Sequence, residues 1–246
     1  MNTILLGGTK GIGRALAREI IEAGNQVFLI GRDPDELERS AADLRARHPQ
    51  NTETGWALCD LEDPSSFEKA LTLGTAYLGR LHTVVVTAGL FALQEDLEED
   101  TELARRLLTV NFANTVTFCE YARKRLLAQG GGTLCVLSSV AGDRGRKPVA
   151  LYGASKAGLS HYLESLDHKY RDQGLITICV KPGFVRTGMT AGLKAPPFAG
   201  NPEDVAKTIY RAIEKGSPLV YTPAMWGVVM AVIRRLPRGV MRRINF

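Results

Sequence analysis

The chain has few cysteines and no leading apolar segment of the length that secretion needs. Its four cysteines are isolated from one another, at Cys59, Cys119, Cys135 and Cys179. Because no Cys-x-x-Cys pair occurs, the sequence argues against a disulfide framework or a cysteine-ligated metal, and favours a reduced, cytoplasmic setting. The first apolar run gives way to glycines after Leu6, so we expect no signal peptide.

No internal repeat, low-complexity tract or Pro/Gly/Ser-rich linker divides the sequence. Its 246 residues, 45% of them hydrophobic, suffice to bury the core of one large domain. Apolar runs without alternation recur between helical patterns, as in parallel sheets covered on both faces. The sequence predicts one α/β domain over residues 1–246, a Rossmann-type doubly wound parallel sheet of about seven strands flanked by helices. The expected strands are 3–6, 26–30, 55–59, 82–87, 133–138, 175–181 and 218–221.

A glycine-rich turn follows the first apolar run. Gly7-Gly-Thr9-Lys10-Gly11-Ile12-Gly13 stands between that run and a helical pattern that reaches Ala23. Glycines let a backbone approach a pyrophosphate closely, and the N-terminus of a helix offers free N–H groups. The order of strand, glycine turn and helix therefore predicts a dinucleotide site.

The residue after the second expected strand bears on the choice of dinucleotide. Sites that prefer NAD place Asp or Glu there, whereas this chain has Gly31-Arg32, with Lys10 in the glycine turn. Two cations suit a 2′-phosphate, so we expect NADP(H) to be preferred over NAD(H). Asp33 follows directly and counts against this preference, and an ordinary role for Arg32 as a loop cation stays open.

Tyr152-Gly-Ala-Ser-Lys156 places a phenol and an ammonium on one face of a helix. A tyrosine has an ordinary pKa of about 10. A nearby ammonium favours the phenolate and lowers that pKa, which suits general acid–base catalysis near neutrality. Ser139 ends the apolar run before this helix, and ligands of parallel sheets bind beyond the carboxyl ends of strands. We therefore expect Ser139, Tyr152 and Lys156 to converge on one point.

Together these motifs resemble the short-chain dehydrogenase/reductase family over nearly the whole chain. The resemblance implies an NAD(P)(H)-dependent oxidoreductase in which Tyr152 protonates a carbonyl oxygen as hydride arrives and Ser139 hydrogen-bonds that oxygen. Lys156 would lower the pKa of Tyr152 and hold the nicotinamide ribose. Asn111 would hold a helix kink and complete a proton relay. Homodimers or homotetramers, built through the helices that carry Tyr152 and Asn111, are also implied.

The resemblance also implies the cofactor contacts. Asp60 and Leu61 would touch the adenine, and the segment after the sixth strand would wrap the nicotinamide end. The family has asparagine where this chain has Thr87, which leaves the adenosine side less defined. The implied cofactor-binding residues are Gly7, Thr9, Lys10, Gly11, Ile12, Gly13, Arg32, Asp60, Leu61, Ala88, Gly89, Tyr152, Lys156, Pro182, Gly183, Val185 and Thr187.

The net charge is concentrated at the end of the sequence. Lys and Arg outnumber Asp and Glu by 31 to 26, and residues 224–246 contain five arginines and no acid, so residues 1–223 balance. The apolar run 224–233 is shorter than the roughly 20 residues that span a bilayer. This tail has three open interpretations: a helix packed over the substrate mouth or a partner subunit, a segment lying on an anionic membrane surface at the cytoplasmic face, or a nucleic-acid site. The third is the weakest, because no basic stripe occurs elsewhere, and we expect no nucleic acid.

The tail and two other segments resemble one subgroup of the family. Residues 226–246, 138–156 and 5–9 are similar to members that reduce a polyprenylphosphoryl keto-ribofuranose. A lipid-linked keto-sugar substrate is thereby implied, with Arg144, Arg146 and Lys147 at its phosphate. Alternatives are a 3-oxoacyl or small-carbonyl reductase and a non-catalytic dinucleotide-binding scaffold or sensor. The substrate wall is expected from residues 90–98 and from a flap at 188–202.

A metal site is not expected. His161, Glu164 and His168 share one helical face, but the pattern favours a polar outer face of the Tyr152 helix over a ligand set.

Overall fold

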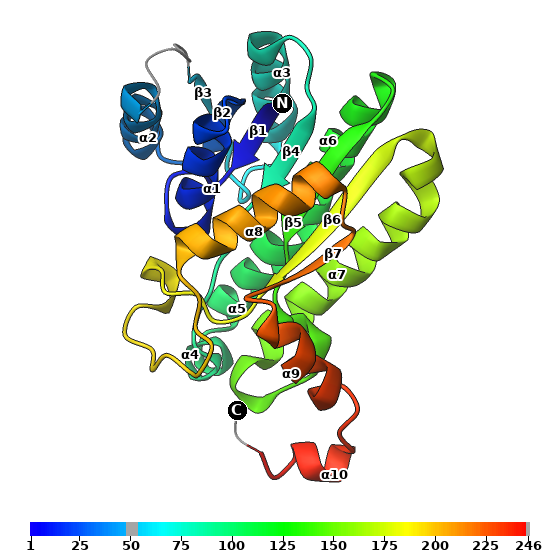
Figure 1. Ribbon diagram of the computed structural model, residues 1–246. Coiled ribbons are helices and arrows are strands. Elements are labelled where there is room, and N and C mark those ends of the chain that lie inside the picture. Colours follow the sequence, from blue (N-terminus) through cyan, green and yellow to red (C-terminus); the bar gives the residue numbers. More distant parts are fainter. Residues whose placement is uncertain (48–53, 245–246) are drawn as a thin grey trace.

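The chain alternates strands with helices and builds one parallel sheet of seven strands in the order β3-β2-β1-β4-β5-β6-β7 (Figure 1). The computed structural model describes residues 1–47 and 54–244. The expected Rossmann-type sheet is confirmed, and each strand begins and ends within one residue of its predicted bounds. The strands are β1 (Asn2–Leu6), β2 (Gln26–Gly31), β3 (Trp56–Leu58), β4 (Thr83–Val86), β5 (Gly132–Leu137), β6 (Leu175–Pro182) and β7 (Leu219–Thr222).

Helices cover both faces of the sheet because its strands are apolar on both sides. On β1, Leu5 packs into one buried cluster while Ile4 and Leu6 pack into the other, and β2, β4 and β5 alternate in the same way. One face is covered by α1 (Gly11–Glu22), α2 (Pro34–Arg47) and α8 (Pro202–Lys215). The other face is covered by α3 (Ser65–Leu78), α6 (Thr115–Ala128) and α7 (Ala150–Tyr170).

Shorter elements gather beyond the carboxyl ends of the strands (Figure 1). They include α4 (Gln94–Glu99), α5 (Thr101–Leu108), α9 (Met225–Ile233) and α10 (Arg238–Met241), together with a π-helical turn at Thr109–Asn114 and 3-10 turns at Val140–Asp143, Lys147–Val149 and Gly188–Thr190. A further 3-10 turn, Arg171–Gln173, lies at the opposite edge of the sheet, just before β6. Within the described residues, no helix has both the length and the apolar content to cross a bilayer.

A third, smaller apolar cluster joins the tail to this end of the sheet. Trp226, Met230 and Ile233 of α9 are buried against Val140, with Phe184 beside them. The tail is therefore packed on loops that follow β5 and β6, at the edge where ligands of such sheets bind.

Candidate active site

The β1–α1 turn is shaped so that only glycine fits at its closest contacts. Gly7 has φ +91°, and a Cβ there would lie 2.6 Å from the backbone nitrogen of Ala88. A Cβ on Gly13 would lie 2.1 Å from the carbonyl oxygen of Gly7. Helix α1 begins at Gly11, and the side chain of its N-cap residue, Lys10, makes no capping hydrogen bond. A bare backbone with free N–H groups fits the pyrophosphate of a dinucleotide, as expected for this turn.

Thr87, the departure from the family pattern, ties the end of β4 to this turn. Its hydroxyl oxygen lies 3.0 Å from the carbonyl oxygens of both Leu6 and Gly7. The hydroxyl can donate to only one of these acceptors at a time, so threonine keeps the link between the two strand ends with a single donor.

The adenosine side presents two accessible cations. The side chains of Lys10 and Arg32 are 71% and 63% exposed, and they pair with Glu36 at 3.8 Å and with Glu62 at 3.4 Å respectively. Asp33 accepts a hydrogen bond from the backbone N–H of Glu36 at 3.1 Å, so its carboxylate is engaged at the start of α2. Both ion pairs are long and exposed, so exchanging the carboxylate partner of either cation for a phosphate would cost little free energy.

Asp60 and Leu61 lie in the connection between β3 and α3. Asp60 accepts from the N–H of Glu62 at 2.9 Å. Leu61 is 5% exposed in the core, and its carbonyl oxygen accepts from Asn114 at 2.6 Å. These contacts fix the loop, while the Leu61 side chain points into the protein.

Ser139, Tyr152 and Lys156 come together beyond the end of β5. The Ser139 side chain lies beside the Tyr152 phenol and acts to lower the pKa of that phenol. Lys156 donates to the carbonyl oxygen of Leu137 at 3.0 Å, and its Nζ lies 5.9 Å from the centre of the Tyr152 ring. The Ser139 oxygen accepts from the N–H of Ala141 at 3.1 Å. The expected convergence of these three side chains is what the structure shows.

The direction of the Tyr152 pKa differs from the sequence-based expectation. Burial raises the pKa of Tyr152 to about 12 and outweighs the lowering effect of Ser139. Burial also lowers the pKa of Lys156 to about 8, so the ammonium is only weakly favoured in its apolar surroundings. The net change in the pKa of Tyr152 is therefore upward, because desolvation of the phenol is its largest cause, and the lowering of this pKa by Lys156 stays a prediction. The ring of Phe91 packs edge-on against that of Tyr152, with the ring centres 5.2 Å apart, and helps to bury the phenol. No sequence motif pointed to Phe91.

Asn111 lies in the π-helical turn, as expected of a residue at a helix kink. Its amide makes two hydrogen bonds with the backbone of Leu90, each 2.7 Å long. A Cβ on Gly89 would lie 3.2 Å from the Asn111 side-chain oxygen and 3.6 Å from Lys156 Nζ. Gly89, Asn111 and Lys156 are thus neighbours, and Ala88 adjoins the glycine turn.

The loop after Ser139 is packed directly on the backbone of α7. A Cβ on Gly142 would lie 2.6 Å from the carbonyl carbon of Lys156, and one on Gly153 would lie 2.8 Å from the carbonyl oxygen of Ala141. Backbone atoms cannot move aside as a flexible side chain can. The two glycines therefore set the distance between the Ser139 loop and the helix that carries Tyr152 and Lys156.

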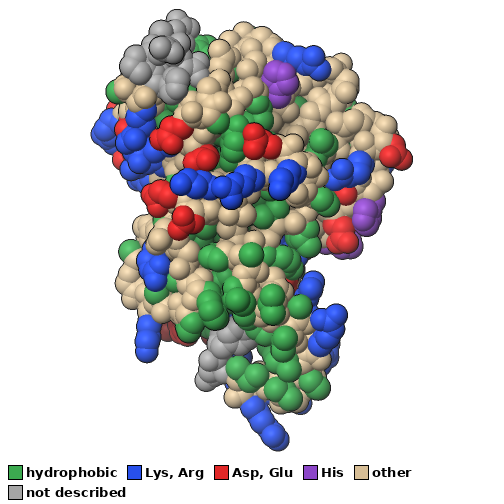
Figure 2. Space-filling view, viewed as in Figure 1, with side chains coloured by type: hydrophobic (Ala, Val, Ile, Leu, Met, Phe, Trp, Pro, Cys, Tyr) green, Lys and Arg blue, Asp and Glu red, His purple; other side chains and the backbone are tan. Residues whose placement is uncertain are grey.

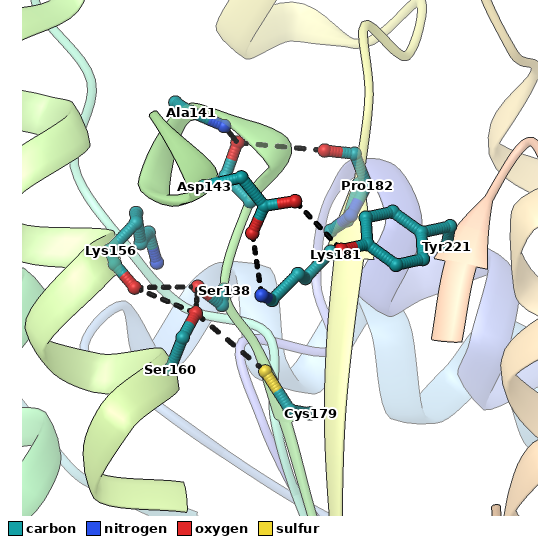
Figure 3. A network of polar contacts seen from close by, with 10 residues as sticks. Ser138, Ala141, Asp143, Lys156, Ser160, Cys179, Lys181, Pro182 and Tyr221 are labelled. Atoms are coloured by element: carbon teal, nitrogen blue, oxygen red, sulfur yellow. Dashed lines mark hydrogen bonds and ion pairs between the residues drawn. The ribbon is translucent and has the colours of Figure 1, made fainter. Parts of the chain in front are cut away.

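A buried polar cluster holds the other side of this loop (Figure 3). Asp143 pairs with Lys181 of β6 at 2.5 Å and accepts from the Tyr221 hydroxyl of β7 at 2.7 Å. The Asp143 side chain is 1% exposed and that of Lys181 is 11% exposed. Sequence reasoning missed all three residues. A lysine inside an apolar strand was the one available signal, because buried charges need a partner.

Ser138 and Ser160 form a second link beside the first (Figure 3). Their hydroxyls lie 2.7 Å apart, and both reach the backbone carbonyl of Lys156, at 2.8 Å and 2.9 Å respectively. This link fixes the end of β5 against the turn of α7 that presents Lys156.

The segment after β6 lies against both the glycine turn and the tail. The Cβ position of Gly11 is 3.2 Å from the Thr187 methyl carbon. A Cβ on Gly183 would lie 2.1 Å from Trp226 Nε1, so the Trp226 ring covers this glycine. The carbonyl oxygen of Pro182 lies 3.5 Å from the Ser139 hydroxyl. Val185 is buried and bridges to Gly200.

Contacts join the two ends of the expected flap, residues 188–202, and a hollow lies along one side of it. The Val185–Gly200 bridge and a hydrogen bond of 3.0 Å from Arg186 to the Ala199 carbonyl join its two ends. A hollow of about 460 Å³ is lined by Phe184, Arg186, Thr187, Gly188, Thr190, Ala191, Leu193 and Ala195. A second hollow, of about 500 Å³, lies at the amino ends of the strands, beside Met1 and His82, and has no part in this site.

Comparison with known proteins agrees with this geometry. The family model described as short chain dehydrogenase matches residues 2–197. The chain belongs to this family. It is accordingly an oxidoreductase that uses NAD(P)(H), and the dinucleotide-binding turn and the Ser139, Tyr152 and Lys156 cluster lie within the matched residues.

Curated relatives of the chain include oxidoreductases and carbonyl reductases. An uncharacterized oxidoreductase of Mycobacterium tuberculosis is 31% identical over 241 residues, covering 98% of this chain and 96% of its own. Carbonyl reductase family member 4 of Xenopus tropicalis is 29% identical over 218 residues, covering 85% of this chain and 89% of its own.

Solved structures share the fold. A short-chain type dehydrogenase/reductase from Mycobacterium ulcerans has a TM-score of 0.84 at 22% identity and covers 98% of this chain and 97% of its own. An actinorhodin polyketide ketoreductase with NADPH has a TM-score of 0.80 at 22% identity and covers 90% of this chain and 95% of its own.

Proposed function

We propose that the protein is an NADP(H)-dependent reductase of a carbonyl group, acting reversibly as an alcohol dehydrogenase. The observation that carries the proposal is the meeting of the Ser139 hydroxyl, the Tyr152 phenol and the Lys156 ammonium beside a glycine turn with free N–H groups. A non-catalytic scaffold has no need for that set of groups.

The residues present fit the dinucleotide and assign a place to each part of it. Gly7, Gly11 and Gly13 leave room for the pyrophosphate, and Lys10 and Arg32 can pair with a 2′-phosphate. The segment from Pro182 to Thr187 adjoins both the glycine turn and Ser139, so it suits the nicotinamide end. A bound dinucleotide supplies the hydride for the carbonyl carbon.

The proton comes from this chain. With a pKa of about 12, Tyr152 is protonated throughout the neutral range and can donate its proton to the carbonyl oxygen. Ser139 hydrogen-bonds the same oxygen. Lys156 then returns a proton towards Tyr152, because the pKa of the ammonium, about 8, lies below that of the phenol, about 12. Asn111 orders the Leu90 backbone beside Lys156, where a relay to solvent can begin.

Replacing Tyr152 with phenylalanine tests this assignment. We expect turnover to fall by about 10²–10⁴-fold, the usual contribution of a general acid–base group, because the ring stays and only the proton donor is lost. NADPH oxidation gives the rate, and fluorescence titration should show NADPH affinity within a few-fold of the parent. Undiminished turnover would refute the role. Tight NADPH binding without oxidation across a broad carbonyl panel would instead favour the scaffold.

Arg32→Ala tests the preference for NADP(H). A lost charge-assisted hydrogen bond to a 2′-phosphate should lower the kcat/KM ratio of NADPH to NADH about tenfold or more, while kcat/KM with NADH stays unchanged. Arg39→Ala is the matched control, since Arg39 is equally exposed and pairs with Glu36. An unchanged ratio would make Arg32 an ordinary loop cation.

For the substrate we propose a keto-sugar carried on a polyprenyl phosphate. Support comes from Arg144, which donates to the carbonyl oxygen of Leu236 at 2.8 Å and so joins the catalytic loop to the apolar, basic tail. Rates with a polyprenylphosphoryl keto-ribofuranose and with a soluble 3-oxoacyl thioester or small ketone would decide the matter. A kcat/KM higher for the soluble compounds would favour the alternative.

A further inference from the structure

Helix α9 has two apolar faces, and only one of them is used inside the protein. Trp226, Met230 and Ile233 face inward and are 8%, 0% and 8% exposed. Met225, Val228 and Val232, spaced three and four residues apart, form a stripe on the outside with exposures of 46%, 62% and 59%. On α10, Val240 is 42% exposed. We call Met225, Val228, Val232 and Val240 the outer apolar face.

Arginines surround this face without acidic partners. Among residues 1–47 and 54–244, no carboxylate forms an ion pair with the five exposed arginines of the tail, which are Arg234, Arg235, Arg238, Arg242 and Arg243. Figure 2 shows apolar side chains gathered over this lower part of the molecule, with cationic side chains at their margin. The rest of the sequence is balanced in charge, so the cationic excess lies here.

We propose that the tail docks on the surface of an anionic lipid bilayer. Aliphatic side chains on one face of a short helix can enter the headgroup region, and arginines beside them can meet lipid phosphates. Each cation near an anionic leaflet strengthens binding by roughly fivefold, so five arginines together dominate the attraction. The helix itself, nine residues long, lies on the surface and does not cross it.

Charge decides between a membrane and a protein partner. An interface between copies of this chain would bring two clusters of five arginines together without a carboxylate in either tail to offset them. An anionic bilayer instead offers a negative surface wide enough to meet all five. Such docking brings α9 to the membrane surface, and Val140 and Phe184, which pack on the inner face of α9 beside the active site, lie just behind it.

Vesicle sedimentation of the full chain tests the proposal without reference to catalysis. We expect binding to mixed phosphatidylcholine–phosphatidylglycerol vesicles at least about tenfold tighter than to pure phosphatidylcholine, and weaker in high salt because surface charges are screened. When inorganic phosphate replaces another salt at constant ionic strength, we expect vesicle binding to stay the same.

Two variants and one matched control locate the surface. Val228→Glu with Val232→Glu, and separately Arg238→Gln with Arg242→Gln and Arg243→Gln, should each weaken vesicle binding at least about tenfold. Leu58→Glu with Leu73→Glu adds the same charge at apolar side chains that are 53% and 47% exposed on other elements, and should bind as the parent does.

Three results would overturn the proposal. They are equal binding to neutral and anionic vesicles, parent-like binding by the Val228 and Val232 variant, and conversion of an oligomer to a smaller species by that variant in light scattering. The last result would make the outer apolar face an interface between copies. A failure of any kind leaves the proposed reductase activity intact, because NADPH oxidation is measured separately.

Discussion

Lys156 and Tyr152 both favour their neutral forms in the folded protein, and this has a measurable effect on stability. The pKa of Lys156 falls from 10.5 to about 8 on folding. Between these values the unfolded chain holds a proton that the folded chain has lost, so the free energy of unfolding rises with pH through this window. The rise is at most about 3 kcal/mol, at about 1.4 kcal/mol for each pKa unit.

Urea unfolding of the parent and of Lys156→Met at a series of pH values measures this term. We expect the stability of the parent relative to the variant to rise between pH 8 and pH 10.5 and to be level below pH 8. Burial raises the pKa values of Cys59, Cys119 and Cys135, which Lys156 does not influence, so these thiols titrate alike in both proteins and cancel in the difference. A level difference across the window would mean that Lys156 stays charged in the folded protein.

Sequence predicted which residues meet at the site but not how they ionise. Tyr152 and Lys156 are placed by helix spacing alone, and Ser139 by the end of an apolar strand. The pKa of Tyr152 depends on burial by side chains such as Phe91, which is distant in the sequence and carries no motif. The direction of this pKa change depends on all the side chains that surround the phenol, and a local sequence motif does not contain that information.

At the scale of elements, the Ser139 loop is held between α7, β6 and β7 by glycine contacts on one side and Asp143 on the other. Asp143→Asn leaves the Lys181 ammonium, 11% exposed, without its carboxylate. We expect unfolding free energy to fall by about 2 kcal/mol or more, since an unpaired buried charge is costly. We also expect kcat to fall while NADPH affinity holds, because Ser139 loses its support.

Glu102→Gln is the control for that loss. It breaks an ion pair with Arg105 whose side chains are 76% and 69% exposed, and should cost no more than about 0.5 kcal/mol. Replacing both buried partners, as Asp143→Leu with Lys181→Met, should recover much of the stability. If Asp143→Asn costs as little as the control, Asp143 does not hold the loop.

The bounds of the strands were predicted closely because each strand is apolar on both faces of the sheet. Continuous Val, Leu and Ile runs fix the strands because a strand buried on both faces tolerates little else. The link from Asp143 to Lys181 and Tyr221 spans 38 and 78 residues, and no spacing rule reaches that far. Gly142 and Gly153 could be seen in the sequence, but their close approach to the backbones of Lys156 and Ala141 could not.

For the whole molecule, the tail was the segment that sequence left most open. Its charge and its short apolar run were visible, yet a run that is apolar on every side does not say which face turns inward. The structure answers with both: Trp226 covers Gly183 and donates to the Phe198 carbonyl at 3.2 Å, while Val228 and Val232 face outward. The tail therefore packs beside the candidate active site on one side and is exposed on the other.

Trp226→Ala tests the inward role. The substitution opens a cavity above Gly183 and frees the carbonyl of Phe198 in the flap, so we expect a loss of about 3–5 kcal/mol in unfolding free energy. We expect kcat/KM on a soluble ketone to fall as well, because Phe184 and Val140 beside Ser139 lose their cover. Met225→Ala on the outer face should change stability by no more than about 0.5 kcal/mol.

The same pair of substitutions shows why removal of residues 224–246 cannot by itself reveal what the tail binds. A chain that ends at Pro223 loses the Trp226 cover together with every tail arginine, so a fall in activity on a lipid-linked substrate has two causes. Measured on a soluble ketone, that truncation should be at least as impaired as Trp226→Ala, since both uncover Gly183. If the truncated chain and Trp226→Ala keep parental stability and soluble activity, the tail has no share in the active-site wall.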